Sequence, residues 1–340
     1  MKNCYIHSAV SISTQNTFET KGFLTEIVEH STKKIEAIHP NYKNFISPSS
    51  LRRMATGVKM GVAASSKALE IANLPQPEAI ITGTGMGCIE DTEKFLNSII
   101  ANKEKFLTPT SFIQSTHNTV AAQIALGLKC KVYNNTYVHG GLSFESALLD
   151  AHMHIIQDEA KNVLVGGVDE LGNEFIDHVM MMENNTENGL KVPFGEGASF
   201  FVLSSDKFEN CIKIKAIETI SSASKEGLIL RLKLFLSQNN IGPKTIDAFV
   251  TGQNGDGFDT YYDKASTLFP ETLNLHYKHL SGEFYTASSF GLFIATQVLK
   301  HQTVPKSLIN QGEFTKPIKT VLLYNQFKGR DHSFILLERQ

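Results

Sequence analysis

Short apolar runs alternate with longer stretches of helical spacing along the whole chain. Residues 78–83 and 247–252 are both apolar runs that end in Thr-Gly, and each is followed by more glycine and then by acidic residues. A short apolar run before glycine is typical of a buried strand that ends in a tight turn. In the first half, further strands are predicted at 132–136 and 162–167, with a helix at 142–156 between them.

The second half repeats this order of elements. In this repeat we predict a strand at 272–275, a helix at 287–299 and a last strand at 320–325. A hairpin-like closing strand follows in each half, at 198–203 and 333–337. The offset between the halves greatly exceeds the roughly 20–50 residues of a solenoid repeat, which indicates a duplicated unit. Alternating strands and helices predict the α/β class with a mixed, mostly parallel sheet. We expect one compact duplicated domain with halves at 1–205 and 206–340.

Two further segments have a distinctive composition. Residues 223–241 predict an amphipathic helix whose core-facing stripe is formed by Leu228, Leu232, Phe235 and Leu236. Residues 177–191 are rich first in methionine and then in glutamate and asparagine. We expect an exposed loop in that second segment.

Composition and charge exclude several classes of function. The chain has 340 residues, of which 41% are apolar and 19% charged, so it can bury a substantial core. A formal charge of −2 provides no basic field for nucleic acid or for a membrane surface. There is no N-terminal signal pattern, and no apolar run is long enough to span a membrane. The four cysteines lack metal or disulfide spacing, which favours the reducing cytoplasm.

We expect neither a metal nor a cofactor. The turn at 83–87 reads Gly-x-Gly-x-Gly, which departs from the dinucleotide fingerprint and favours a strand-end turn. His152 and His154 are two positions apart and point in different directions on a helix. His276 and His279 can face one another, but the sequence offers no third ligand.

Four stretches resemble the β-ketoacyl synthase family. They are the segment 110–125, the Asn-Thr-Tyr-Val-His-Gly-Gly elbow at 135–141, the strand end Val-Leu-Val-Gly-Gly-Val-Asp at 163–169, and Phe-Gly-Glu-Gly-Ala at 194–198. Their order, together with the duplication, implies the thiolase-like α/β/α/β/α fold. Residues 50–59 further resemble a compact chain-length-factor-like subgroup found in aryl polyene and flexirubin clusters.

This resemblance implies a catalytic set that the chain does not keep. A condensing synthase needs a cysteine at the start of a buried helix, where the helix dipole lowers the thiol pKa. That position falls on Val138, or on His139 if the register shifts by one. Neither side chain can form the usual thioester.

The two histidines of the family are also replaced. The first falls on Gln253, or on Asn254 one position later, and the second falls on Glu283, which follows the retained Lys278. A carboxylate there either repels malonate and the developing enolate or forms an ion pair with Lys278. The loop at 325–330 resembles a glycine-rich family loop, with Phe327 retained and most glycines replaced.

The segment at 110–125 implies a dimer, because in the family it reaches across the subunit interface. Phe112, Ile113, Gln114 and His117 can therefore line or close a partner's acyl tunnel, or can form ordinary interface packing.

The resemblance therefore implies a subunit of fatty acid, polyene or polyketide-type biosynthesis. The first hypothesis is a chain-length factor that pairs with a cysteine-bearing ketosynthase supplied by an acyl carrier protein. The second is a homodimeric enzyme in which Gln253, Glu283 or His139 supports malonyl decarboxylation or hydrolysis. The third is a silent binder of acyl chains or carrier protein.

Overall fold

A single mixed sheet runs through the whole molecule. The computed structural model describes residues 2–20, 22–183 and 189–340. The sheet has eleven strands in the order β3-β2-β4-β5-β1-β6-β11-β10-β7-β8-β9. Their bounds are β1 Cys4–Ile12, β2 Ala79–Gly83, β3 Tyr133–Tyr137, β4 Asn162–Asp169, β5 Gly197–Ser204, β6 Ile212–Ser221, β7 Ala248–Thr251, β8 Leu273–His276, β9 Ile309–Gln311, β10 Thr320–Phe327 and β11 Asp331–Arg339.

Helices connect most of these strands. The α-helices are α1 Pro48–Leu51, α2 Thr56–Ile71, α3 Ile89–Ala101, α4 Pro109–Ser115, α5 Thr119–Leu128, α6 Ser143–Ile156, α7 Asn173–Glu183, α8 Lys225–Gln238, α9 Thr260–Ser266, α10 Lys278–Ser281 and α11 Ser288–His301. Four 3-10 turns are η1 Tyr42–Asn44, η2 Gly140–Leu142, η3 Pro243–Thr245 and η4 Lys306–Leu308. Among the described residues, no helix has the combination of length and apolar character that a membrane crossing needs.

The strand order confirms the duplicated, thiolase-like fold. The order β3-β2-β4-β5-β1 in the first half is matched by β8-β7-β10-β11-β6 in the second, and the halves join where β1 pairs antiparallel with β6. Less of the sheet is parallel than the sequence pattern suggested. Among the named strands of the described residues, parallel pairing occurs in β3-β2-β4 and β8-β7-β10, whereas the closing strand of each half returns antiparallel. The boundary between 1–205 and 206–340 stays a prediction.

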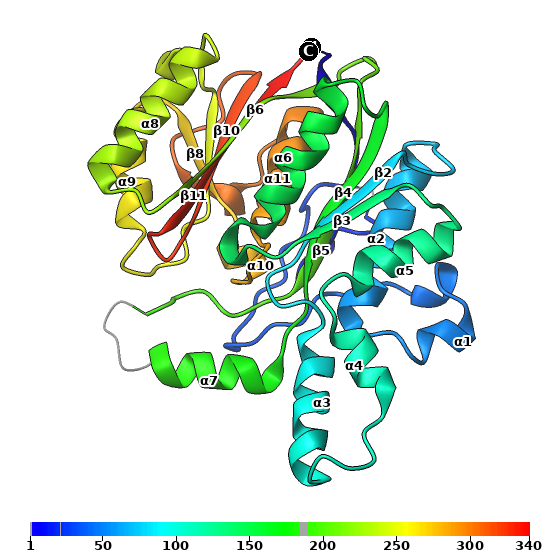
Figure 1. Cartoon of the computed structure of the whole chain (residues 1–340). Coiled ribbons are helices and arrows are strands. Elements are labelled where there is room, and N and C mark those ends of the chain that lie inside the picture. Colours follow the sequence, from blue (N-terminus) through cyan, green and yellow to red (C-terminus); the bar gives the residue numbers. More distant parts are fainter. Residues whose placement is uncertain (1, 21, 184–188) are drawn as a thin grey trace.

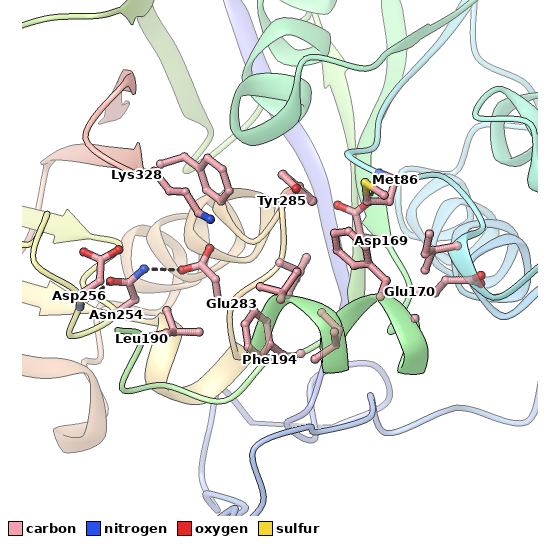
Figure 2. A pocket seen from close by; sticks show the side chains of 18 of the residues that line it. Met86, Asp169, Glu170, Leu190, Phe194, Asn254, Asp256, Glu283, Tyr285 and Lys328 are labelled. Carbon is pink, nitrogen blue, oxygen red and sulfur yellow. Dashed lines mark hydrogen bonds between the residues drawn. The ribbon is translucent and has the colours of Figure 1, made fainter. Parts of the chain in front are cut away.

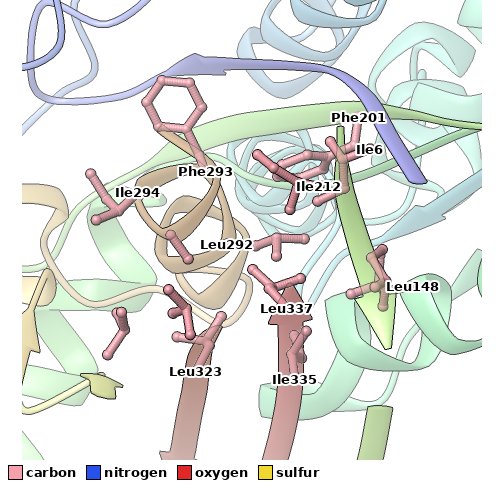
Figure 3. Packing of buried hydrophobic residues seen from close by; sticks show 14 of the residues in the cluster. Ile6, Leu148, Phe201, Ile212, Leu292, Phe293, Ile294, Leu323, Ile335 and Leu337 are labelled. Carbon is pink, nitrogen blue, oxygen red and sulfur yellow. The ribbon is translucent and has the colours of Figure 1, made fainter. Parts of the chain in front are cut away.

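Five layers result from the way the two halves face each other. Helices α6 and α11 contact strands of both halves and lie between them, as Figure 1 shows. Most residues of α11 are buried, as expected for a helix that is covered on all sides. Figure 3 shows this central core, in which Leu292 of α11, Leu148 of α6 and Leu337 of β11 come together. Helices α2 and α5 cover one outer face, and α8 and α9 cover the other.

The predictions for residues 223–241 and 177–191 have different outcomes. Helix α8 forms within the predicted range, and its stripe is at most 2% exposed at Leu228, Leu232, Phe235 and Leu236. The prediction of a loop at 177–191 is wrong in its first part, because α7 continues to Glu183. Residues 184–188 of that segment lie outside the described residues.

Candidate functional site

The glycine-rich turn after β2 is held by a buried carboxylate at the end of β4. Asp169 Oδ1 accepts hydrogen bonds from Thr84 Oγ1 (2.8 Å), from the backbone nitrogen of Gly85 (2.8 Å) and from that of Met86 (3.2 Å). Its Oδ2 accepts from the backbone nitrogen (3.0 Å) and the Oγ1 (2.8 Å) of Thr286. Burial raises the pKa of Asp169, and these donors oppose that rise. The predicted strand-end turn is therefore confirmed.

A second carboxyl group next to Asp169 lies in a different environment. Glu170 accepts hydrogen bonds from the backbone nitrogens of Gly57 (2.5 Å) and Glu90 (2.9 Å) and is only 5% exposed. Burial raises the pKa of Glu170 to about 8, and the charges of Glu90 and Asp91 contribute to the rise. The Glu170 carboxyl group is therefore largely protonated at neutral pH.

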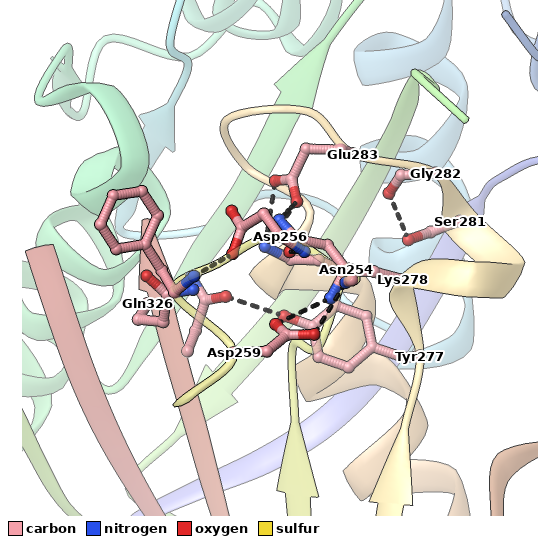
Figure 4. A network of polar contacts seen from close by, with 12 residues as sticks. Asn254, Asp256, Asp259, Tyr277, Lys278, Ser281, Gly282, Glu283 and Gln326 are labelled. Atoms are coloured by element: carbon pink, nitrogen blue, oxygen red, sulfur yellow. Dashed lines mark hydrogen bonds and ion pairs between the residues drawn. The ribbon is translucent and has the colours of Figure 1, made fainter. Parts of the chain in front are cut away.

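Two residues predicted for the histidine positions of the family, Asn254 and Glu283, form a compact polar cluster with Lys278, shown in Figure 4. Lys278 Nζ lies 3.0 Å from Glu283 Oε1 and 2.9 Å from Oε2. Asn254 Nδ2 donates to Glu283 Oε2 at 2.8 Å. The three residues are 1%, 6% and 5% exposed, for Lys278, Glu283 and Asn254 respectively. The ion pair that the sequence offered as one interpretation of Glu283 is therefore present.

The structure distinguishes between the two candidates for the first histidine position. Asn254 is the residue brought to Glu283. Gln253 points elsewhere, donating to Asp263 Oδ1 at 3.4 Å and accepting from Asn310 Nδ2 at 2.8 Å. Asp259 holds the turn in this register, because its oxygens accept from the backbone nitrogens of Asn254 (3.2 Å) and Gly255 (2.7 Å).

At the head of α6 the predicted positions face outwards. Val138 is 41% exposed, and His139 is exposed with its Nδ1 2.9 Å from Ser146 Oγ. The free cysteines lie in other elements: Cys4 in β1, Cys88 before α3, Cys130 after α5 and Cys211 before β6. Burial raises the pKa of the Cys4 and Cys88 thiols, which keeps both protonated.

Two aromatic rings pack against the glycines at this end of α6. Tyr285 and Phe327 have ring centroids 5.1 Å apart. A β-carbon added at Gly85 would lie 2.2 Å from Tyr285 Cβ, and one added at Gly141 would lie 2.4 Å from Phe327 Cβ. Only glycine allows the backbone so close to these rings. We call Tyr285 and Phe327 the aromatic barrier.

On the other side of the aromatic barrier lies a cavity of about 200 Å³, shown in Figure 2. We call it the acidic cavity. Its apolar wall includes Met86, Ile89, Phe175, Ile176, Val179, Leu190 and Phe194. Its polar lining includes Asp169, Glu170, Asn254, Asp256, Glu283 and Lys328. The cavity therefore combines an apolar wall with four carboxyl groups, and of the predicted site residues it contains Asn254, Glu283 and Phe327.

Comparison with known proteins supports the predicted family. Residues 29–189 match the sequence model of a family described as the N-terminal domain of β-ketoacyl synthases. This part of the chain is therefore similar to the N-terminal domain of β-ketoacyl synthases. The predicted family is thereby confirmed, whereas no curated protein matches the chain.

Solved structures extend the likeness to the fold of the whole chain. The ishigamide ketosynthase/chain length factor has a TM-score of 0.78 at 15% identity, covering 100% of this chain and 99% of that one. A type II PKS acyl-carrier protein complex with its ketosynthase, AntDE:AntF, has 0.81 at 13%, covering 99% of both chains. Ketosynthase ApeO with its chain length factor ApeC, from Xenorhabdus doucetiae, has 0.76 at 14%, covering 100% and 98%. The β-ketoacyl synthase-like fold thus spans both halves.

The candidate residues for a subunit interface do not all point outwards. Phe112 and Ile113 of α4 are 54% and 56% exposed, and His117 is also exposed. Gln114 is 8% exposed, and its Oε1 accepts from the backbone nitrogen of Ala55 at 3.4 Å. Gln114 therefore ties α4 to the start of α2 within its own subunit.

The histidines singled out in the sequence make separate contacts. His152 Nε2 lies 3.3 Å from the carbonyl oxygen of Ile214, whereas His154 faces Asp150 and Glu159. The rings of His276 and His279 are 4.0 Å apart, and burial with the nearby His276 lowers the pKa of His279 to about 4. Within the described part of the chain, no three histidine, cysteine or acidic residues are grouped as a metal site would need.

Sequence reasoning missed the carboxyl groups that organise this site. The sequence predicts Asp169 only as the end of a family-like strand and predicts no role for Glu170. Glu145, fully buried in the first turn of α6, accepts from Asn325 Nδ2 (3.2 Å) and Ser333 Oγ (2.9 Å). The available signals were the two adjacent acidic residues after the apolar run 163–168 and the acidic Glu145 at the start of a largely apolar helix.

Proposed function

We propose that this chain is a chain-length-factor-like subunit. It pairs with a cysteine-bearing ketosynthase and limits the length of the product without condensing acyl groups itself. The observation that carries the proposal is the head of α6, where both residues predicted for the nucleophile position, Val138 and His139, face outwards. Thioester formation needs a thiolate at that point, and the chain's four thiols belong to other elements.

The second support is the hydrogen bonding within the Lys278–Glu283–Asn254 cluster. Decarboxylative condensation needs donors aimed at an oxygen on which negative charge develops. Here the Nδ2 of Asn254 and the Nζ of Lys278 both donate to Glu283. With both donors engaged by Glu283, neither is aimed at the enolate oxygen of a malonyl group.

The aromatic barrier provides a physical stop. Tyr285 and Phe327 separate the head of α6 from the acidic cavity. Gly85 and Gly141 lie so close to the two rings that little free space remains around them. We place the end of the product chain against this barrier, because another two-carbon unit would have to displace a ring. Two solved structures of the same fold are described as ketosynthases with chain length factors, which supports this role.

The surface beside the head of α6 suits a partner subunit. Strand β3 is an edge of the sheet, and Tyr133 on it is 46% exposed. An exposed edge strand with apolar neighbours is a template for pairing with another chain. Phe112, Ile113 and Val138 add large apolar groups that are 41–56% exposed. We therefore propose a heterodimer across this surface, with a carrier protein delivering acyl groups of fatty acid, polyene or polyketide type to the partner.

Co-expression with a cysteine-bearing ketosynthase tests the proposal. We expect the two chains to co-purify and the pair to release products of defined length, measured by mass spectrometry. Tyr285→Ala removes the phenol ring of the aromatic barrier and should shift the distribution by at least one two-carbon unit. Phe314→Ala, a change of a ring that is 38% exposed and lies outside the acidic cavity, is the matched control.

Two outcomes contradict the proposal. One is an unchanged product length with both Tyr285→Ala and Phe327→Ala in a pair that still assembles. The other is release of CO2 from a malonyl carrier protein by the purified chain alone, abolished in Glu283→Gln. That second result would support a homodimeric enzyme with altered chemistry.

A further inference from the structure

A second cavity lies at the far end of the molecule from the acidic cavity. Its volume is about 400 Å³, and it is lined by the first part of β1, the start of β6, the last turns of α11 and the end of β11. Helix α11 spans the distance between the two cavities. Thr286, just before α11, bonds Asp169, whereas Lys300 and His301 in its last turn line the second cavity. A helix of 14 residues is about 21 Å long.

Positive charge dominates the lining of this second cavity, which we call the basic cavity. His7, Lys300, His301 and Arg339 line it, with Glu209 as its one acidic residue. Across the residues that the structure describes, none of the four basic groups is in an ion pair. Two cations, Lys300 and Arg339, with two imidazoles that can donate hydrogen bonds, are suited to an anion.

Backbone features orient two of these four groups. The register between β1 and β5 shifts between Ile6 and Ser8, so His7 has no partner in that ladder. A β-bulge of this kind redirects a side chain, and here the imidazole lines the basic cavity. Arg339 Nη2 donates at 3.1 Å to Oδ1 of Asn210, which has a left-handed φ of 55°.

The helix dipole offers a simpler explanation for only part of the cluster. Lys300 and His301 are in the last turn of α11, where cations offset the negative end of the dipole. His7 and Arg339 come from strands and have no such relation to a helix end. Their convergence on the same cavity needs another reason.

The floor of the basic cavity is apolar. Ile6 and Ile212 are 4% and 3% exposed, and the Phe208 ring lies 5.0 Å from the His7 ring. A free inorganic anion would contact the rim and leave this floor to water. The floor therefore favours a ligand with a carbon skeleton as well as negative charge.

We propose that the basic cavity binds an organic phosphate. The phosphate dianion is held by Arg339, Lys300 and the two imidazoles, because guanidinium and ammonium groups form charge-assisted hydrogen bonds with phosphate oxygens. The carbon part of the ligand lies on Ile6, Ile212 and Phe208. The inference does not rest on the pairing with a ketosynthase.

Isothermal titration calorimetry on the full chain tests this proposal, with adenosine monophosphate as the probe. We expect saturable binding that weakens at least tenfold in Arg339→Gln and also weakens in His7→Asn. Lys244→Gln, which removes one charge from an exposed lysine in η3, is the matched control and should leave the affinity unchanged.

Two companion ligands separate the sources of affinity. Adenosine should bind at least tenfold more weakly than adenosine monophosphate, and inorganic phosphate should also bind more weakly. Absence of binding at millimolar probe, or an equal loss in Lys244→Gln, overturns the proposal. Inorganic phosphate binding as tightly as the nucleotide overturns the role of the apolar floor. Thermal unfolding of each variant without ligand confirms that it is folded.

Discussion

The two cavities at opposite ends of α11 differ in what their charged groups contact. The acidic cavity is lined by four carboxyl groups, and two of them, Asp169 and Glu283, are saturated by donors from the protein. The basic cavity is lined by a lysine, an arginine and two histidines that, among the described residues, form no ion pair. The saturated carboxyl groups of the acidic cavity hold backbone turns and helices together, whereas the basic groups of the basic cavity remain available to a ligand.

This difference separates stability from binding. A buried, saturated carboxylate is costly to remove, because its donors are left without partners. An exposed cation contributes little to folding. Variants in the two cavities should therefore affect different measurements.

The largest effect is expected at Asp169. Asp169→Ala leaves three backbone nitrogens and two hydroxyl groups without their acceptor, in a place where water has little access. We expect the free energy of unfolding to fall by about 3–5 kcal/mol in urea titrations. Asp169→Asn keeps one acceptor oxygen and should recover part of the loss. A change below about 1 kcal/mol in Asp169→Ala would show that the turn does not depend on this carboxylate.

The ion pair in the acidic cavity should show strong coupling. Glu283→Leu alone leaves the Lys278 ammonium buried without a counter-charge, and we expect a loss of about 3 kcal/mol. The double variant Lys278→Met, Glu283→Leu removes both charges and should lose less than the single variant. Urea unfolding of all four members of this double-mutant cycle gives the coupling energy. Simple additivity would mean that the two charges do not depend on one another.

Glu170 predicts a pH-dependent stability. Its pKa is raised from the ordinary value of 4.5 to about 8 in the folded chain, so the folded state binds this proton more tightly than the unfolded state. The contribution of Glu170 is therefore complete below 4.5 and is lost as the pH rises towards 8. Glu170→Gln removes the titration, so the difference in unfolding free energy between variant and parent should shift in favour of the variant over this window. A constant difference across these pH values would contradict the raised pKa.

The smallest effect is expected in the basic cavity. Lys300→Gln should change the free energy of unfolding by less than about 0.5 kcal/mol, since the side chain is exposed and forms no ion pair among the described residues. Chemical denaturation measures this directly. A large loss would place Lys300 with the structural charges and would remove the contrast between the two cavities.

Local patterns predicted the elements of the fold well. The Thr-Gly runs are β2 and β7, and the stripe of α8 is buried, because strand and helix periods are visible within a few residues. Helix α7 was missed, since the predicted loop began at Asp177, in the middle of the helix. The apolar face of α7 lines the acidic cavity through Phe175, Ile176 and Val179. The polar residues of the same segment made this helix difficult to predict from the sequence.

The site was predicted less completely, because its geometry depends on long-range partners. The sequence left Gln253 and Asn254 as alternatives, and the choice depends on the turn that Asp259 holds. The sequence offered an ion pair between Glu283 and Lys278 as one of two interpretations, and that pair is present. The bonds from Asp169 to Thr84 and Thr286 join residues far apart in the chain, and no local pattern announces them.

The position of β1 has a consequence for how the protein is made. This strand, Cys4–Ile12, lies between β5 and β6, which begin at Gly197 and Ile212. At roughly 5–20 residues per second, a ribosome needs about 10–40 s to reach those partners after β1 has emerged. During that interval a mostly apolar strand has both edges unpaired. The nascent chain should therefore depend on chaperones that shield β1 until β5 and β6 have been translated.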